Sequence, residues 1–208
     1  MKETKLKFGI MGSGSWATAL IKILSENNSK INWYIRNIEN IEFIKNNSHN
    51  PNYLSSVELN LNKLKITSEI NEVVEASDVI ITAIPSEYVN DEMKKIDIDM
   101  SKKIIMCALK GLVPETNLLF GEHMQKYYGI STDKFLVIGG PCHAEEVALE
   151  KLSYLTIGSS NLKLCKIISK KFTCKYIKVN ASDDVIGIEY ASMLKNIFAL
   201  AVGISNGL

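Results

Sequence analysis

Short apolar runs alternate with segments of helical spacing along most of the 208-residue chain. The apolar runs predict strands over Leu6–Met11, Ile31–Ile35, Leu64–Thr67, Val79–Ala83, Lys103–Cys107, Phe135–Ile138, Tyr154–Ile157 and Tyr176–Val179. Helices are predicted between them over Ser15–Glu26, Ile38–Asn46, Glu69–Glu75, Glu87–Lys95, Thr116–Tyr127, Ala144–Glu150 and Leu162–Phe172. This alternation is typical of βαβ units, so we expect an α/β fold with a doubly wound, mainly parallel sheet and right-handed crossovers. The pattern leaves open whether the last strands run antiparallel at an edge.

One long polar segment interrupts the alternation. Asn46–Leu61 is rich in Asn and Ser and contains Pro51, so we interpret it as a loop near the open end of the sheet. Long loops in compact domains are often functional lids. A mobile surface insertion explains the same composition equally well.

The pattern changes after Asn180. Ala181–Leu208 contains no proline and predicts one apolar helix, with Ser182 as the N-cap and Asp183 and Asp184 in the first turn. A helix that is apolar nearly all round needs other helices packed against it. We therefore expect an α/β domain over residues 1–180 and, over residues 181–208, the first helix of a truncated helical domain.

Composition and charge are those of an ordinary globular domain, with 46% hydrophobic and 23% charged residues. The net charge of +1 gives no reason to expect nucleic acid or an anionic membrane as a partner. A local basic site could still bind a phosphorylated small molecule. No uninterrupted apolar stretch is long enough to predict a membrane span, and we interpret Met193–Leu208, which contains Lys195 and Asn196, as a buried helix.

The cysteines argue against a metal site. Cys107, Cys142, Cys165 and Cys174 form no CxxC pair, so we expect free thiols in a reducing cytoplasm and no bound metal. The apolar run within Met1–Gly14 is broken by glycine and too short for a signal peptide.

A glycine-rich turn follows the first predicted strand. Gly12, Gly14 and Ala17 form a GxGxxA pattern between that strand and a helix. The first glycine permits the tight turn, the second lets the backbone approach a pyrophosphate, and the alanine allows close helix–strand packing. The helix N-terminus then offers N–H groups and a positive dipole end to the phosphates. The pattern favours dinucleotide binding over a glycine turn without a ligand.

Arg36 follows the second predicted strand, where an acidic residue would bind the ribose hydroxyls of NAD. An arginine can instead pair with the 2′-phosphate of NADP or stack on adenine. We therefore predict that NADP(H) is accepted at least as well as NAD(H). The alternative is an ordinary surface arginine.

Further candidates lie at other strand ends. Pro85 and Ser86 either line the nicotinamide side of the site or merely stop their strand. Lys110 faces the same cleft or is a solvated surface lysine. The glycines at 139 and 140 allow close backbone approach to a ligand. His143 could be a general acid, although an exposed or helix-capping histidine is the better interpretation.

Lys195 stands among small and apolar neighbours on the last predicted helix. Burying its charged amine is costly without a partner, and a polar border from Ser192 and Glu189 could compensate. A lysine so placed could transfer a proton to or from a ligand. A lysine whose amine reaches out to water explains the pattern equally well.

These segments together resemble the bacterial NAD(P)-dependent glycerol-3-phosphate dehydrogenase family. The resemblance is carried by GSGSWATAL (12–20), WYIRN (33–37), IPS (84–86), ALKGL (108–112), GGPCHAEE (139–146) and EYASMLKNIFALAVGISNGL (189–208). It implies a Rossmann-type domain followed by an all-helical substrate domain. It also implies interconversion of dihydroxyacetone phosphate and sn-glycerol 3-phosphate with NAD or NADP, for phospholipid synthesis in the cytoplasm.

The resemblance also implies roles for individual residues. Besides Gly12 and Gly14, the expected cofactor contacts are Ser15, Trp16, Arg36, Lys110 and Ala144. The expected substrate contacts are Lys110, Gly140, Cys142 and Lys195, of which Lys195 matches the catalytic proton-transfer lysine. Many relatives have a hydroxyl residue where Cys142 stands. A homodimer is one possible assembly, and the sequence does not give the oligomeric state.

The chain departs from the family in length, because relatives continue well beyond its last residue. Either it is a fragment of a longer protein or it is a shortened gene product. We expect it to bind the cofactor and to turn over weakly or not at all. Two other functions remain open: a related β-hydroxyacid-type dehydrogenase, which the ALKGL and GGPCHAEE segments disfavour, and a non-catalytic dinucleotide-binding module.

Overall fold

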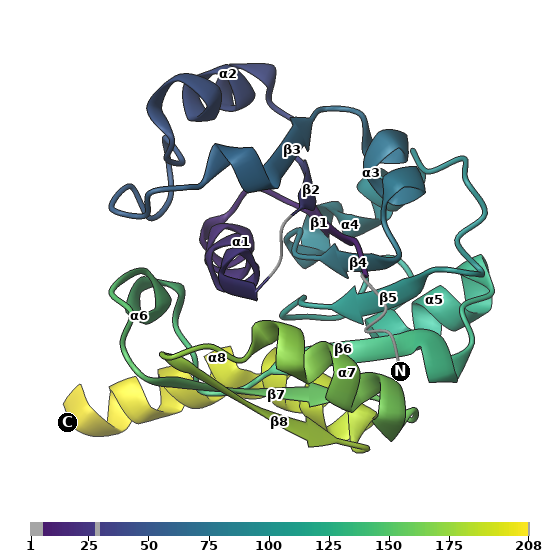
Figure 1. The fold of residues 1–208 in the computed structure, drawn as a ribbon. Coiled ribbons are helices and arrows are strands. Elements are labelled where there is room, and N and C mark those ends of the chain that lie inside the picture. Colours follow the sequence, from purple (N-terminus) through teal and green to yellow (C-terminus); the bar gives the residue numbers. More distant parts are fainter. Residues whose placement is uncertain (1–5, 28–29, 208) are drawn as a thin grey trace.

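The computed structural model describes residues 6–27 and 30–207, which form one sheet covered by helices on both faces (Figure 1). Within these residues the sheet has eight strands in the order β3-β2-β1-β4-β5-β6-β7-β8. Their bounds are β1 Phe8–Met11, β2 Ile31–Tyr34, β3 Leu64–Thr67, β4 Val79–Thr82, β5 Ile104–Cys107, β6 Phe135–Gly139, β7 Ser153–Gly158 and β8 Ile177–Ser182. Leu208, the end of the predicted last helix, lies outside the described residues, as do residues 1–5 and 28–29.

The helices also follow the predicted pattern. Their bounds are α1 Ser15–Asn27, α2 Ile38–Asn47, α3 Ile70–Ala76, α4 Ser86–Met93, α5 Phe120–Tyr128, α6 Ala144–Ala148, α7 Leu162–Phe172 and α8 Val185–Gly207, with short 3₁₀ helices at Leu61–Lys63 and Thr132–Lys134. Helix α8 begins later than predicted, as described below, and so does α5. Residues 113–118 form a closed turn instead, in which the N–H of Val113 donates to the carbonyl of Leu118 at 3.0 Å.

Two apolar cores form, one on each face of the sheet. The first includes residues of α1, α2 and α7, and the second includes residues of α3, α4 and α5. All four residues of β1, β2 and β4 are buried, as expected for central strands that are covered on both faces. The covered sheet therefore confirms the predicted Rossmann-type α/β fold.

The chain reverses its direction of sheet growth beside β1. The strand lies between β2 and β4, and all pairings from β3 to β6 are parallel. In such sheets ligands bind outside the carboxyl ends of the strands, at the point where the order reverses. The last two strands do not continue the parallel pairing. Strand β7 runs antiparallel to β6, and β8 runs parallel to β7.

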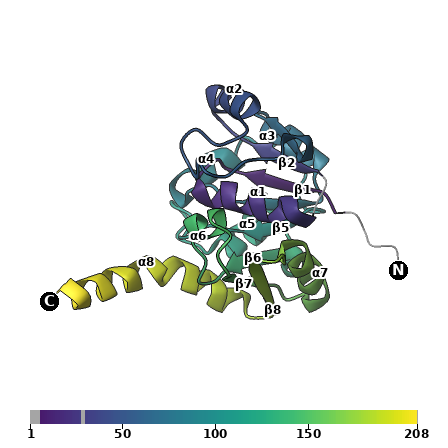
Figure 2. The same cartoon turned by 60° about the vertical axis from the view of Figure 1, so that its left-hand side comes forward.

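Helix α8 differs from its prediction in two ways. Ser182 belongs to β8, and the helix is capped by Asp184, whose side chain accepts the N–H of Gly187 at 2.9 Å. Both aspartates therefore precede the helix. The interpretation of residues 193–208 as a buried helix is wrong for the described residues, because Glu189 is the buried residue of α8 and its last turns extend away from the body (Figure 2).

By length and composition alone, α8 could cross a membrane, with a mean hydropathy of 1.5. Only 6% of that window is buried. The observation changes the expectation that no segment is apolar enough to span, but a helix that packs on another domain has the same composition. Polar Glu189 and Lys195 interrupt the apolar sequence of α8.

The segment between α2 and β3 is anchored to the body of the protein. Val57 and Leu59 are buried in the first core, at 2% and 4% exposure. Asn50 is also buried, and its amide donates to the carbonyl of Ser13 at 3.0 Å and to the hydroxyl of Thr18 at 2.9 Å. These contacts hold the loop against the glycine turn and disfavour its interpretation as a loosely attached insertion.

Candidate functional site

Five parallel strands bring the predicted site residues to one edge of the sheet. Gly12 follows β1, Arg36 follows β2, Pro85 follows β4, Lys110 follows β5 and Gly140 follows β6. Because these strands are parallel, their carboxyl ends lie at the same edge. Two hollows at this edge divide the residues between them.

The glycine turn has the geometry that its sequence predicts. Gly12 has a φ of +120°, and an added Cβ would lie 2.4 Å from the carbonyl oxygen of Ala83, so only glycine fits. The indole N–H of Trp33 on β2 donates to the carbonyl of Gly12 at 2.7 Å and holds the turn in place. At Gly14, in contrast, an added Cβ would meet nothing within 4 Å. The turn therefore leaves open space beside Gly14, directly before α1.

The first hollow, called here the Arg36 pocket, has a volume of about 220 Å³. Its lining residues are Gly12, Ser13, Gly14, Tyr34, Arg36, Tyr53, Ile84, Pro85, Tyr88 and Glu92. The guanidinium of Arg36 lies 5.8 Å from the centre of the Tyr88 ring. Its side chain is 67% exposed, so it can reach a ligand in the pocket.

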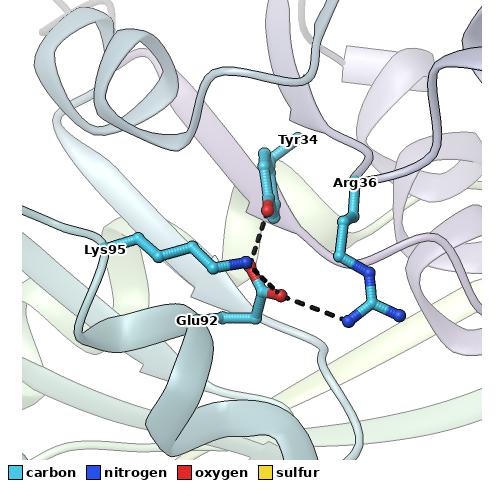
Figure 3. Close-up of polar contacts among 4 residues, drawn as sticks. All are labelled: Tyr34, Arg36, Glu92 and Lys95. Carbon is cyan, nitrogen blue, oxygen red and sulfur yellow. Dashed lines mark hydrogen bonds and ion pairs between the residues drawn. The ribbon is translucent and has the colours of Figure 1, made fainter.

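A buried carboxylate, that of Glu92, lies beside Arg36 (Figure 3). Glu92 accepts the hydroxyl of Tyr34 at 2.5 Å, and its other oxygen lies 2.8 Å from the amine of Lys95 and 3.5 Å from Arg36. Burial alone would raise the pKa of Glu92, but the hydrogen bonds from Lys95 and Tyr34 bring this pKa below its usual value. Burial and the carboxylate raise the pKa of Tyr34. Glu92 is therefore an anion and Tyr34 a neutral donor.

The second hollow, called here the lysine cleft, has a volume of about 770 Å³. Its lining includes Trp16, Leu109, Lys110, Gly140, Cys142, His143, Thr156, Ser192, Lys195 and Phe198. Lys110 reaches it from the loop after β5, and Lys195 reaches it from α8. Burial and the neighbouring Lys195 lower the pKa of Lys110. Such a pair of cationic groups suits an anionic ligand or a developing negative charge.

Glycines at the end of β6 position the lysine cleft. A Cβ added to Gly139 would lie 2.9 Å from the hydroxyl of Ser192, so glycine lets α8 pack directly on the strand. Lys195 lies about one turn further along the helix. Gly140 has a φ of +126°, and its Cβ would lie 2.8 Å from the carbonyl of Tyr154. Both glycines are thus needed for the close packing that forms the cleft.

The remaining predicted residues are distributed less simply. Cys142 is buried in the cleft lining, and burial raises the pKa of its thiol. His143 stands at the N-cap of α6, lines the cleft and makes no side-chain capping bond. Ala144 begins α6 and is 7% exposed, but it lines neither hollow. Pro85 lies in the Arg36 pocket rather than with the lysines, and a Cβ on Gly111 would lie 2.9 Å from the Ser86 hydroxyl.

Glu189 does not form the polar border that the sequence allowed for Lys195. Six residues apart, the two side chains point to different sides of a helix, whereas Ser192 does line the cleft. The carboxylate of Glu189 instead accepts the N–H of Gly121 at 3.1 Å, on the second core. It therefore ties α8 to the start of α5.

The buried Glu189 predicts a stability that depends on pH. Burial raises the pKa of Glu189 to about 7, well above its usual value, and the nearby Glu122 adds to the shift. Folding favours the protonated form of Glu189. The stability that this side chain contributes to the folded state is therefore complete at pH 4 and is lost as the pH rises through 7. We expect Glu189→Gln to be more stable than the wild type at pH 8 by roughly 3 kcal/mol, with little difference near pH 5.

Urea denaturation at both pH values measures this effect. Glu42→Gln is the control for removing a charge, because Glu42 is an exposed carboxylate of another helix, α2. Unfolding curves of Glu189→Gln that follow the wild type at every pH would contradict the assignment.

Six residues of the Arg36 pocket were not predicted as site residues, and three of these, Tyr53, Tyr88 and Glu92, also lie outside the motifs that carry the family resemblance. Tyr53 comes from the polar loop of residues 46–61, while Tyr88 and Glu92 come from α4. Glu92 lies three positions before Lys95, a helical spacing that could have indicated the ion pair. No feature of the sequence placed that pair beside Arg36.

Comparison with known proteins agrees with the geometry. The sequence model of the family described as NAD-dependent glycerol-3-phosphate dehydrogenase N-terminus matches residues 7–165. A protein of Listeria innocua named glycerol-3-phosphate dehydrogenase (NAD(P)+) is 35% identical in an alignment of 209 positions, which covers 99% of this chain and 61% of that protein. One of Bacillus pumilus with the same name is 31% identical, covering 97% and 59%.

Solved structures give the same result. The crystal structure of glycerol-3-phosphate dehydrogenase from Coxiella burnetii has a TM-score of 0.85 and 27% identity, covering 98% of this chain and 62% of that one. A glycerol-3-phosphate dehydrogenase of Plasmodium falciparum has a TM-score of 0.87 and 28% identity, covering 99% and 60%. The chain thus spans about 61% of the length of the Listeria relative. Because the family match covers more than half of the sequence, the chain belongs to the family of NAD-dependent glycerol-3-phosphate dehydrogenases, to whose N-terminal part it corresponds.

Proposed function

We propose that this chain is the dinucleotide-binding part of an enzyme that interconverts dihydroxyacetone phosphate and sn-glycerol 3-phosphate with NAD(H) or NADP(H). The observation that carries the proposal is that Lys110 and Lys195, from separate parts of the chain, share one cleft with Trp16 of the glycine-turn helix. The relatives bear the name of this activity. The setting of the proposed reaction is phospholipid synthesis in the cytoplasm.

A dinucleotide fits the residues at the glycine turn. The backbone at Gly14 is open where a pyrophosphate would approach, and Gly12 holds the turn in a shape that other residues cannot adopt. We assign the cofactor to residues Gly12, Gly14, Ser15, Trp16, Arg36, Lys110 and Ala144, and the phosphorylated substrate to Lys110, Gly140, Cys142 and Lys195. The adenosine end then occupies the Arg36 pocket, and the reacting end lies in the lysine cleft.

The two lysines supply the acid–base chemistry. Bound NAD(P)H provides the hydride for the ketone carbon of the substrate. Negative charge then develops on the ketone oxygen, where the ammonium of Lys195 donates the proton. Lys110, which lies beside Lys195 in the cleft, stabilises the same charge. In the reverse reaction, a neutral Lys195 amine accepts the proton of the substrate hydroxyl.

The proposed enzyme has a second, helical domain beyond this chain. We assign residues 1–180 to the dinucleotide-binding domain and residues 181–208 to the beginning of the helical one. Ile197, Phe198 and Leu200 of α8 are 62% to 67% exposed, and these apolar side chains suit burial against further helices. Groups that bind the substrate phosphate would then come from that second domain.

Binding and turnover of the 208-residue chain test the proposal. We expect NADH and NADPH to bind saturably, with NADPH at least as tight, because Arg36 offers a cation to the 2′-phosphate. Reduction of dihydroxyacetone phosphate, followed by nicotinamide absorbance, is expected to be weak or absent in this chain and present in a form that carries the second domain.

The outcomes separate the alternatives. Binding without reduction of dihydroxyacetone phosphate in the extended form would indicate a non-catalytic dinucleotide-binding module. Reduction of other small oxoacids in its place would indicate a β-hydroxyacid-type dehydrogenase. Robust turnover by the 208-residue chain would contradict the need for a second domain.

A further inference from the structure

The Arg36 pocket contains an acidic group that the proposed function does not use. Among the residues that line this pocket, Glu92 is the acidic one, and its side chain is only 5% exposed. It comes from α4, a different element from the glycine turn. Its carboxylate contacts three groups at once: Tyr34 from β2, Arg36 just after β2, and Lys95 just after α4 (Figure 3).

The position of this cluster makes it relevant to the choice of cofactor. The end of the second strand is where dinucleotide-binding folds distinguish the ribose 2′-hydroxyl of NAD from the 2′-phosphate of NADP. Acid at that point favours NAD, and arginine favours NADP. In this chain Arg36 occupies the strand end, and the carboxylate of Glu92 from helix α4 lies 3.5 Å from its guanidinium.

We propose that Glu92 sets the selectivity between NADP(H) and NAD(H), because its carboxylate offsets the positive charge that Arg36 and Lys95 offer to a 2′-phosphate. The inference rests on the proposed dinucleotide binding. With Glu92 ionised, Arg36 and Lys95 together leave a single net positive charge in the cluster. The pocket then accepts a 2′-phosphate without requiring one.

The geometry favours this effect of charge over an effect on the position of Arg36. The contact of 3.5 Å between Arg36 and Glu92 is long, the arginine is 67% exposed, and Tyr88 also lies beside the guanidinium. The carboxylate therefore does little to fix the position of the arginine side chain. As a buried charge, however, it is poorly screened by solvent and acts on any phosphate that approaches Arg36.

The substitution Glu92→Gln isolates the charge. Glutamine has nearly the same shape, and its carbonyl oxygen can still accept the hydroxyl of Tyr34. We expect the ratio of the NADH to the NADPH dissociation constant to rise by about five- to ten-fold, the scale of one partly screened unit charge. The ratio for 5′-AMP and 2′,5′-ADP, which carry only the adenosine end, should rise in parallel, and both effects should shrink at high salt.

Two further variants complete the experiment, measured by calorimetry on the 208-residue chain. Lys95→Gln removes a cation whose side chain is 48% exposed and leaves an amide N–H that can still donate to Glu92, so the ratio should move the opposite way, toward NADH. Glu150→Gln is the control, because that carboxylate likewise pairs with two cationic side chains, Lys22 and Lys175 at 3.0 Å each, but lines neither hollow.

The inference is supported if the ratio moves toward NADPH in Glu92→Gln, moves toward NADH in Lys95→Gln and stays unchanged in Glu150→Gln. An unchanged ratio in Glu92→Gln, or a shift toward NADH, would overturn it, as would a ratio in Lys95→Gln that moves toward NADPH. If Glu92→Gln fails to fold, the Lys95→Gln result decides alone. Failure of the wild-type chain to bind either dinucleotide would overturn the proposed function itself and is seen before any variant is made.

Discussion

Replacing Lys195 with alanine is expected to lower turnover by about 10³-fold in the proposed enzyme, extended by the proposed helical domain, while cofactor affinity changes by less than about two-fold. The amine of Lys195 is the proposed proton donor to the ketone oxygen, and a positioned general acid commonly contributes a factor of 10² to 10⁴. Lys195 lines the lysine cleft, whereas the glycine turn and Arg36 line a separate hollow. The loss should therefore fall on kcat and leave dinucleotide binding intact.

A second substitution separates the proton from the charge. Lys195→Arg keeps a cation in the cleft, but a guanidinium does not release its proton near neutral pH. We expect it to recover part of the ketone reduction and almost none of the alcohol oxidation. Lys178→Ala, at an exposed lysine of β8, is the control for removing a charge. Full turnover in Lys195→Ala would refute the proposed role.

The fold was predictable because its signals are local. The apolar runs at 79–82 and 104–107 have the length and continuity of strands covered on both faces, and helical spacing separates such runs throughout. The glycine turn after β1 adds a further local signal, because the positive φ at residue 12 is readily adopted only by glycine. A strand end followed by Lys110 or Gly140 then places each residue at the ligand edge of a parallel sheet.

What the sequence could not predict depends on contacts between distant segments. Glu92 and Arg36 are 56 residues apart, and nothing in either segment indicates that they meet. The direction in which Glu189 points follows from the packing of α8 on β6, which the close approach of Gly139 and Ser192 determines. The exposure of α8 could not be read from its composition either, since a buried helix and an unpartnered one have the same apolar pattern.

Gly14 offers the clearest separation of ligand binding from folding. An added Cβ at Gly14 meets nothing within 4 Å, so Gly14→Ala should fold normally and gain up to about 1 kcal/mol from the lower entropy of its unfolded chain. The same methyl group would stand where the pyrophosphate approaches the backbone. We expect affinity for both NADH and NADPH to fall by roughly 100-fold, which corresponds to about 3 kcal/mol of steric cost.

Gly12→Ala provides the contrast, since both variants add one methyl group to the same turn. At Gly12 the methyl carbon would lie 2.4 Å from the backbone oxygen of Ala83, in a residue with a φ of +120°, so the folded state itself should lose at least about 2 kcal/mol. Thermal unfolding and cofactor titration of the two variants side by side measure both effects. If Gly14→Ala kept wild-type affinity for both dinucleotides, the pyrophosphate would not lie at this turn, and the two lysines would lose the cofactor on which their proposed chemistry depends.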